Sequence, residues 1–281
     1  MQVVTTLGEW KAVRAACAGA VGVVPTMGAL HEGHLSLVRR ARAENDVVVA
    51  WVFVNPTQFA PQEDFGAYPR PLARDLELLE AEGVDLVLAP TVAEVYPPGF
   101  QTRVEVTDLT TVLEGAARPG HFRGVCTVVT KILCLTQPAR AYFGQKDAQQ
   151  AVVVRRLVRD LGFPCDVVVC STVREPDGLA LSSRNVYLSP AERAAAPVLH
   201  RALQAAAAVL AAGERRGAAL REAMQAVLAA EPLARPDYVS VAEAETLAEC
   251  ETVTGPVLAS LAVRIGATRL IDNLPLEPPP G

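Results

Sequence analysis

The sequence predicts an α/β fold, a Rossmann-like doubly wound parallel sheet followed by a smaller α+β C-terminal domain. Two observations predict it. Apolar runs alternate with amphipathic segments through about residue 170, and the composition becomes alanine-rich after Val173. We therefore expect a first domain over residues 1–175 and a second over residues 176–281.

Five apolar runs in the first part lack the polar alternation of a half-exposed strand. Such runs are typical of strands that are buried on both faces of a parallel sheet. The runs are Val21–Pro25, Asp46–Val54, Val84–Ala89, Ala139–Phe143 and Val167–Cys170.

The segments between these runs repeat apolar residues every three or four positions, which predicts helices. They are His34–Glu44, Leu72–Glu82, Val125–Leu135 and Gln149–Leu161. Ligands of doubly wound sheets bind beyond the carboxyl ends of the strands, so we expect the chemistry in the loops that follow each strand.

The second domain begins its first long helix at a capping box. Ser189 is the expected N-cap, Pro190 occupies the first helical position, and Glu192 reaches back to the cap. The sequence predicts two alanine-rich helices and then three short strands, over Ala191–Ala212, Gly217–Ala230, Tyr238–Val241, Val257–Val263 and Arg269–Asn273.

The charge balance excludes several kinds of partner. The net charge of −5 argues against general binding to nucleic acid or to an anionic membrane, because both need a basic face. No stretch approaches the length of a membrane-spanning helix. Residues 1–20 carry Glu9, Lys11 and Arg14 and have no unbroken apolar core, so no signal peptide is expected. We expect a cytoplasmic protein.

The cysteines show no zinc or redox spacing. None of the six forms a C-x-x-C pair, and we expect reduced, mostly buried thiols.

The first strand leads into Pro25-Thr-Met-Gly-Ala-Leu-His-Glu-Gly-His34, which we call the first loop. Glycines let the backbone approach a ligand closely, and the N-terminus of the helix expected near His34 favours an anion. Two imidazoles three residues apart suit phosphate oxygens. A solvated turn and a zinc site are the alternatives, although no third metal ligand is evident.

The next loop, Phe53-Val-Asn-Pro-Thr-Gln-Phe59, offers the amides of Asn55 and Gln58. An amide both donates and accepts hydrogen bonds, which suits a hydroxy acid. The alternative is a simple Asn-Pro turn.

Two further segments carry basic side chains that could bind an anion. Gly144-Gln-Lys-Asp147 puts Lys146 at the start of a helix, where the dipole disfavours a cation unless an anion binds there. Upstream, Arg118-Pro-Gly-His-Phe-Arg-Gly124 reads as a glycine-flanked basic loop.

The fifth strand leads to Leu181-Ser-Ser-Arg-Asn185, where two hydroxyls beside a guanidinium suit a phosphate. Each segment alone is a weak signal and is compatible with a polar loop. Together they place donors for an anion or a nucleotide at one edge of one sheet.

These five segments, in this order, closely resemble the motifs of the pantothenate synthetase family across about residues 20 to 190. The His-x-Gly-His element alone would indicate only the wider nucleotidyltransferase group. The resemblance implies an ATP-dependent ligase that joins pantoate to β-alanine through a pantoyl-adenylate, releasing AMP and pyrophosphate. One departure is Gln145, where many members have Glu.

The resemblance also implies roles for single residues. The catalytic set would be His31, His34, Lys146, Ser182, Ser183 and Arg184. The ATP site would comprise Met27, Gly28, Ala29, Leu30, His31, Glu32, Gly33, His34, Gly144, Gln145, Lys146, Asp147, Val173, Leu181, Ser182, Ser183 and Arg184. The other substrates would contact Gln58, Gln150, Asn55 and Arg123.

The expected cofactor of the substrate ATP is Mg²⁺, whose protein ligands are unassigned apart from Asp75 as a candidate. The resemblance implies a homodimer through the first domain, which binds ATP and pantoate. Because water would hydrolyse the adenylate, we expect the second domain to close as a lid, with a hinge near Glu175 to Gly178. The competing hypotheses are a cytidylyltransferase-like enzyme and a non-catalytic nucleotide-binding regulator.

Overall fold

The computed structural model describes residues 1–60 and 65–279. The chain forms two compact units. The first unit is Met1–Gly144 with Val153–Ser171, and the second unit is Gln145–Val152 with Thr172–Gly281. This division groups residues 145–152 and 172–175 with the second unit, whereas the expected boundary placed them in the first.

A parallel sheet of six strands forms the centre of the first unit. Its strand order is β1-β4-β3-β2-β5-β6. The strands are β1 (Gln2–Val4), β2 (Val21–Thr26), β3 (Val47–Val52), β4 (Leu86–Leu88), β5 (Arg140–Gly144) and β6 (Asp166–Cys170). The fold class predicted from the sequence is confirmed.

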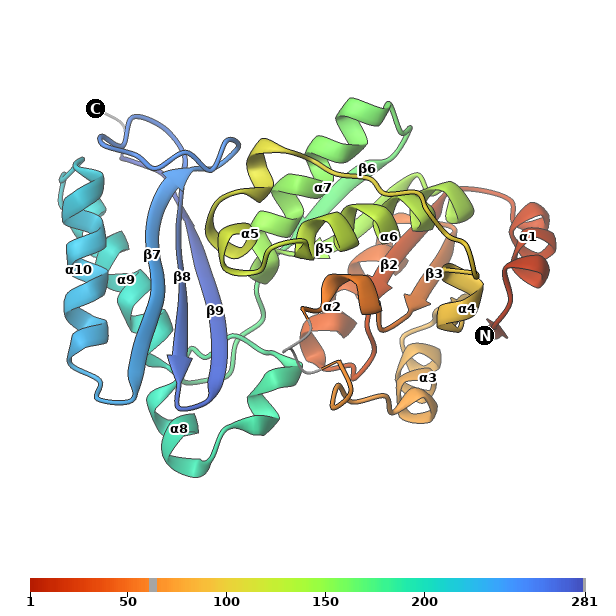
Figure 1. The fold of residues 1–281 in the computed structure, drawn as a ribbon, viewed down its shortest axis with the longest axis horizontal. Helices are drawn as coiled ribbons and strands as arrows, with labels where there is room; N and C mark the ends of the chain where they lie inside the picture. Colours follow the sequence, from red (N-terminus) through yellow and green to blue (C-terminus); the bar gives the residue numbers. More distant parts are fainter. Residues whose placement is uncertain (61–64, 280–281) are drawn as a thin grey trace. The chain divides into compact units, whose positions relative to one another are not determined.

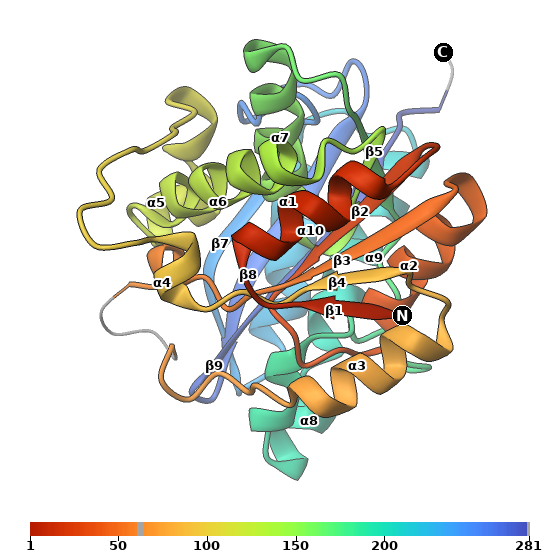
Figure 2. The same ribbon diagram turned by 90° about the vertical axis from the view of Figure 1, so that its right-hand side faces the viewer.

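Helices cover both faces of this sheet, and Figure 2 shows α1 and α3 on opposite sides of it. The helices are α1 (Leu7–Ala16), α2 (Glu32–Glu44), α3 (Leu72–Ala81), α4 (Val92–Val95), α5 (Leu113–Ala117), α6 (His121–Thr136) and α7 (Ala148–Leu161). Two short 3-10 turns, η1 (Pro56–Gln58) and η2 (Asp108–Thr110), belong with them, whereas η3 (Gln145–Asp147) and the first residues of α7 group with the second unit.

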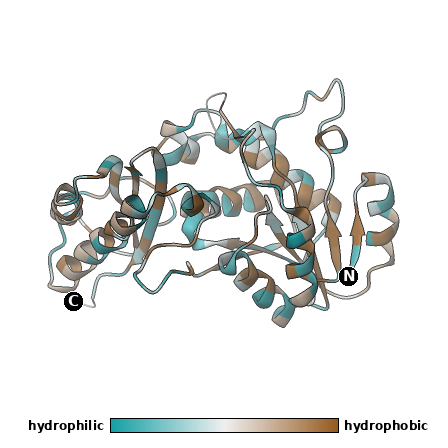
Figure 3. Ribbon diagram, turned by 90° about the horizontal axis from the view of Figure 1, so that it is seen from below, coloured by the Kyte–Doolittle hydropathy of each residue, from teal (hydrophilic) through white to brown (hydrophobic). Residues whose placement is uncertain are grey.

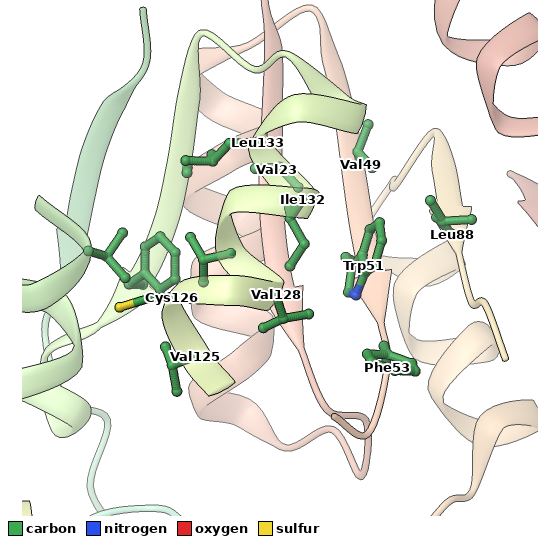
Figure 4. Packing of buried hydrophobic residues seen from close by; sticks show 14 of the residues in the cluster. Val23, Val49, Trp51, Phe53, Leu88, Val125, Cys126, Val128, Ile132 and Leu133 are labelled. Carbon is green, nitrogen blue, oxygen red and sulfur yellow. The ribbon is translucent and has the colours of Figure 1, made fainter. Parts of the chain in front are cut away.

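Alternate residues of each strand enter different cores, because side chains of a strand point to opposite faces. Val49 and Trp51 of β3 pack with α6, whereas Val48 and Ala50 pack with α2. Figure 4 shows the α6 side chains facing these strands, and Figure 3 shows that the strands are largely hydrophobic along their length. The missing alternation in the sequence therefore follows from burial on both faces.

Two elements at the N-terminus were missed. β1 is only three residues long and α1 has one fully buried residue, Trp10, so neither produces a strong periodic signal. Trp10 is nevertheless anchored, because its indole Nε1 donates to the Leu135 carbonyl at 2.9 Å.

The second unit packs helices on one face of an antiparallel sheet of three strands, in the order β7-β8-β9 (Figure 1). Its elements are η4 (Ser183–Tyr187), α8 (Pro190–Ala195), α9 (Val198–Ala211), α10 (Gly217–Ala229), β7 (Ala234–Glu243), β8 (Val257–Ile265) and β9 (Thr268–Leu276). The expected capping box of Ser189 and Glu192 is present.

The first alanine-rich helix differs from the expectation because it divides into α8 and α9 at Pro197. Proline has no backbone N–H, so it cannot donate to the preceding turn. By length and composition, Pro190–Ala211 is a candidate membrane span, contrary to the expectation that no stretch approaches that length. Half of its most apolar window is buried, and Leu199, Ala202 and Leu203 pack in the core of the second unit.

The cysteines are free thiols in the described part of the chain. Cys126, Cys170 and Cys250 are buried, but Cys134 is exposed, so the expectation of mostly buried thiols holds only in part. Burial raises the pKa of Cys126 to about 11, which keeps it protonated and unreactive at neutral pH.

The segment expected to be a hinge is a closed hairpin. Arg174 bridges Ala180, and the Gly178 N–H donates to the Glu175 carbonyl at 2.9 Å. The guanidinium of Arg174 donates to both carboxylate oxygens of Asp272 at 2.6 and 2.9 Å, and this ties the hairpin to β9. The hinge expectation is therefore wrong, because Glu175 to Gly178 lies wholly within the second unit.

We predict that Asp272→Ala lowers the free energy of unfolding by about 3 kcal/mol or more, because it leaves a largely buried guanidinium without its partner. The Asp272 side chain is 2% exposed and that of Arg174 is 18% exposed. Asp160→Ala is the matched control. It removes an exposed partner of Arg156 and should cost at most about 0.5 kcal/mol. Urea unfolding followed by circular dichroism compares them, and equal losses would contradict the prediction.

Candidate active site

The strand order reverses between β2 and β5, since the chain adds β3 and β4 on one side of β2 and β5 and β6 on the other. The pairing of β2 with β5 covers only Gly22 with Arg140 and Val23 with Ala141. Beyond this point the two strands no longer pair with each other, although β2 stays paired with β3 and β5 with β6 to their carboxyl ends. A ligand crevice is expected outside such a reversal point, and the first loop begins there.

A buried carboxylate holds the first loop in shape. Asp75 of α3 is 1% exposed, and its two oxygens accept the N–H groups of Ala29 and Leu30 at 2.9 and 2.8 Å. Gly28 and Ala29 both have left-handed backbones, with φ of +81° and +52°. The left-handed region is unfavourable for alanine, so the two hydrogen bonds that Asp75 accepts offset the strain of the Ala29 backbone.

Helix α2 begins at Glu32, two residues earlier than expected, and His31 is its N-cap. The Gly33 N–H donates to Nδ1 of His31 at 3.2 Å, and the His31 N–H donates to Nδ1 of His34 at 3.3 Å. A neutral imidazole that accepts at Nδ1 carries its proton on Nε2. The capping arrangement therefore makes the Nε2–H of each ring a hydrogen-bond donor.

The two rings lie together, with centroids 4.1 Å apart. They stand at the N-terminus of a helix of 13 residues, where the dipole and the free N–H groups favour an anion. The first loop thus combines imidazole donors, a helix N-terminus and left-handed glycine, which together suit phosphate oxygens.

Gln58, the last residue of η1, forms hydrogen bonds through both its side chain and its backbone carbonyl. Its side chain accepts from the Asn55 amide at 3.0 Å and donates to the sulfur of Met27, also at 3.0 Å. Its carbonyl accepts from Arg118 at 3.3 Å and lies 2.8 Å from Nδ1 of His121. The contact with Met27 brings the second loop against the first, as the sequence predicted.

Asn55 is held in place by several hydrogen bonds. It is 1% exposed, and its oxygen accepts from Thr57 and from the Tyr96 hydroxyl, each at 2.9 Å. Its amide nitrogen donates to Gln58 and to the Gly124 carbonyl. These partners hold Asn55 beside Gln58, and its contact with a substrate stays a prediction.

The expected basic loop at Arg118–Gly124 is largely helical, because α6 begins at His121 with Gly120 as its N-cap. A Cβ at Gly124 would lie 2.3 Å from the Thr57 carbonyl oxygen, so only glycine lets α6 approach the second loop this closely. Arg123 is exposed in the first turn of α6. A cation at this end of a helix is unfavourable unless an anion is bound nearby.

The remaining expected residues belong to the second unit. Lys146 lies in η3, and its side chain is 22% exposed with Nζ 3.4 Å from the Asp147 carboxylate. Gln150 is half-buried in the first turn of α7. Gly144, the last residue of β5, directly precedes η3 along the chain.

The third group of expected residues surrounds the Arg174 hairpin. Val173 accepts from the Leu181 N–H at 3.0 Å, which closes the hairpin. Ser182 caps η4, and its hydroxyl accepts from the Arg184 N–H at 3.3 Å. Strand β9 contacts both η3, which carries Lys146, and η4, which begins at Ser183. Both segments therefore pack against the same strand of the second unit.

The metal alternative finds no support. No group of three His, Cys, Asp or Glu side chains suited to a metal ion occurs within residues 1–60 and 65–279. His31 and His34 each use Nδ1 on the backbone, as described above.

Several supporting residues escaped the sequence analysis. Arg118 and His121, which contact the backbone carbonyl of Gln58, were placed in a glycine-flanked basic loop, and Asp75 was considered only as a metal ligand. One signal could have found Asp272 and Asn273: two polar residues interrupt the apolar strand that they share.

Comparison with known proteins gives consistent matches. The model of the family described as pantoate-beta-alanine ligase matches residues 2–275. The chain is 66% identical over 277 residues to the pantothenate synthetase of Roseiflexus castenholzii, covering 99% of this chain and 100% of the relative. It is 62% identical over 275 residues to that of Chloroflexus aggregans, with 97% and 99% covered.

Two solved structures extend the comparison. Pantothenate synthetase from Thermus thermophilus matches with a TM-score of 0.94 at 55% identity, over 98% of this chain and 99% of that one. A pantoate-beta-alanine ligase from Francisella tularensis, complexed with beta-gamma ATP and beta-alanine, matches with a TM-score of 0.81 at 33% identity. That alignment covers 100% of this chain and 99% of the other.

We predict that Gly28→Ala lowers the free energy of unfolding by about 1–2 kcal/mol, because alanine disfavours the left-handed backbone. Its Cβ would also lie 2.9 Å from Oδ2 of Asp75. Gly66→Ala is the control, since a Cβ there meets nothing within 4 Å, and it should change the stability by less than about 0.5 kcal/mol. Thermal unfolding compares the stability of the two variants, and hydrogen exchange of the backbone amides reports on the first loop in each. Unchanged exchange in Gly28→Ala would contradict the account.

Proposed function

The chain belongs to the pantoate–β-alanine ligase family, and on that premise we propose that it condenses pantoate with β-alanine in a reaction driven by ATP. The reaction passes through a pantoyl-adenylate and releases AMP and pyrophosphate. The family match supersedes the cytidylyltransferase-like and regulator hypotheses. The structural observation that carries the proposal is the pairing of His31 and His34 at the N-terminus of α2, where their ring centroids lie 4.1 Å apart and the helix dipole favours an anion.

In the first step a carboxylate oxygen of pantoate attacks the α-phosphorus of ATP, and the bond from that phosphorus to the bridging oxygen of pyrophosphate breaks. The carboxylate is already ionised at neutral pH, so no general base is needed. The barrier arises from an anion approaching a polyanion, and donors and cations lower it. His31, His34, Lys146, Ser182, Ser183 and Arg184 are the catalytic residues that we propose for this role.

The nucleotide itself would bind along the three segments described above. The first loop supplies residues 27–34, and Gly28 and Gly33 let the backbone approach the phosphates. Residues 144–147, Val173 and residues 181–184 complete the nucleotide contacts.

The side-chain amides of Gln58 and Gln150 are the groups that we propose bind pantoate. The Gln58 amide is held by Asn55 and Met27, and the backbone carbonyl of Gln58 by Arg118 and His121, so the side chain is preorganised for a hydroxy acid. We place Gln150 beside the same substrate and Arg123 near the substrate carboxylates.

The Asp75 carboxylate is a suitable ligand for the Mg²⁺ that would accompany ATP. Its carboxylate is buried, accepts two backbone N–H groups and forms no ion pair within the described residues, which leaves its charge for a cation. Mg²⁺ typically takes one or two carboxylates together with phosphate oxygens and water. When bound, the ion would neutralise phosphate charge.

In the second step the β-alanine nitrogen attacks the acyl carbon of the adenylate. The amide bond forms, the bond from that carbon to the phosphate oxygen breaks, AMP leaves, and the amine loses a proton. Water must be excluded, because it would hydrolyse the adenylate. We propose that the second unit acts as a lid, moving where the chain passes between units at residues 144–145, 152–153 and 171–172. Identical interdomain angles in free and adenylate-bound crystals would refute the lid.

We further propose a cytoplasmic homodimer that needs neither nucleic acid nor a membrane. Sedimentation should give twice the chain mass of 29.8 kDa. A monomer at micromolar concentration would contradict the dimer.

Product analysis tests the reaction. The protein is mixed with Mg-ATP, pantoate and β-alanine, and the nucleotide products are separated. AMP and pyrophosphate that appear only with pantoate would support the adenylate route. ADP with phosphate would indicate an acyl-phosphate instead and would refute the proposal.

We predict that Lys146→Ala slows adenylate formation by at least about 30-fold, which corresponds to ~2 kcal/mol of lost transition-state stabilisation. Lys11→Ala, which removes an exposed lysine of α1, is the control and should leave the rate unchanged. Pantoate-dependent pyrophosphate release measures both. A near wild-type rate for Lys146→Ala would remove this residue from the mechanism.

We predict that Gln58→Ala raises the KM for pantoate at least about tenfold, because about 1.4 kcal/mol of hydrogen bonding to the substrate is lost. The KM for ATP should change less than about twofold. Gln101→Ala, at an exposed amide, serves as the control. Equal changes in both KM values would show a general disturbance of the site instead.

A further inference from the structure

Asn273 of β9 makes three hydrogen bonds with the segment that carries Lys146. Its Nδ2 donates to the carbonyl of Gln145 and to the carbonyl of Lys146, each at 2.9 Å. Its Oδ1 accepts from the Gln145 side chain, also at 2.9 Å. Asn273 is 3% exposed, so water offers little competition for these bonds.

The direction of the Lys146 side chain depends on its backbone more than on a side-chain partner. The nearest carboxylate oxygen, on Asp147, is 3.4 Å from Nζ, and the Asp147 side chain is 47% exposed. A pair of this kind contributes little orientation. The two carbonyl contacts therefore place the Cα from which Lys146 extends.

Strand β9 is a rigid support for this contact. Asn273 is paired with Ser260 of β8, and its N–H donates to Asp272 at 2.8 Å. Asp272 in turn holds Arg174 of the neighbouring hairpin. Two adjacent residues of one strand thus fix the segments of Lys146 and of Val173.

We propose that Asn273 is a positioning residue for the reaction, which sets the place of Lys146 through the carbonyls of residues 145 and 146. This rests on the proposed role of Lys146 at the ATP phosphates. Gln145 takes part in the same contact, because its side-chain amide donates to Oδ1 of Asn273, a bond that a glutamate carboxylate would not donate.

The test is a double-mutant cycle on adenylate formation, measured as pantoate-dependent pyrophosphate release at varied ATP. The variants are Asn273→Ala, Lys146→Ala and the double variant. Asn273→Ala should lower kcat/KM for ATP about tenfold in the wild-type background, but less than about twofold when Lys146 is already alanine. Losses that multiply in the double variant would overturn the proposal, as would a wild-type rate for Asn273→Ala.

Asn273→Asp keeps the shape and the acceptor for Gln145 but turns an oxygen toward both carbonyls. It should lose more activity than Asn273→Ala, and it replaces that variant in the cycle if the alanine form does not fold. An active Asn273→Asp would overturn the proposal.

Asn45→Ala is the matched control, since it removes another buried amide, bonded to Ala41 and Tyr142 in the first unit. It should lower stability yet leave kcat/KM unchanged. The outcomes also separate the two claims. A normal rate for Lys146→Ala would refute the role of Lys146. A slow Lys146→Ala with independent losses from Asn273→Ala would refute only the role of Asn273.

Discussion

The Asp75 carboxylate is the interaction on which the first loop depends. It is buried in α3 and accepts the N–H groups of Ala29 and Leu30, where two successive residues have left-handed backbones. Without these two charge-assisted hydrogen bonds, nothing in the local sequence would favour a left-handed alanine. The shape of this loop decides where α2 begins, and therefore where both imidazoles stand. One carboxylate from a different helix thus sets the geometry of the loop that we propose for the nucleotide.

The chemistry follows from how the helix cap uses the imidazoles. Nδ1 of His31 and Nδ1 of His34 each accept a backbone N–H, and this fixes both rings, 4.1 Å apart between centroids, at the N-terminus of α2. Gln58 is held in a similar way, because four neighbours fix it before any substrate arrives. Preorganisation of this kind is what an anion-to-polyanion reaction requires.

Local patterns predicted the fold and the loops that carry donors, because buried parallel strands, amphipathic helices and capping boxes leave signals within a few residues. β1 and α1 were too short or too weakly periodic to appear, and the break at Pro197 was overlooked in an alanine-rich stretch. The residues that support the site could not be predicted from local sequence patterns. Asp75 lies 46 residues from Ala29, and Asn273 lies 127 residues from Lys146, so only the folded chain reveals these contacts. The contacts of Asn55 with Gly124 and Tyr96 were beyond local patterns for the same reason, since these residues lie 69 and 41 positions away.

The most direct measurement is nitrogen-15 NMR of labelled histidine, in the free protein and with a non-hydrolysable ATP analogue. We expect that neutral His31 and His34 carry their protons on Nε2 and that both Nε2–H signals shift when the nucleotide binds. His31→Gln and His34→Gln would assign the signals. Protons on Nδ1, or Nε2–H signals that do not respond to the nucleotide, would contradict the claim that the helix cap turns these two rings into phosphate donors.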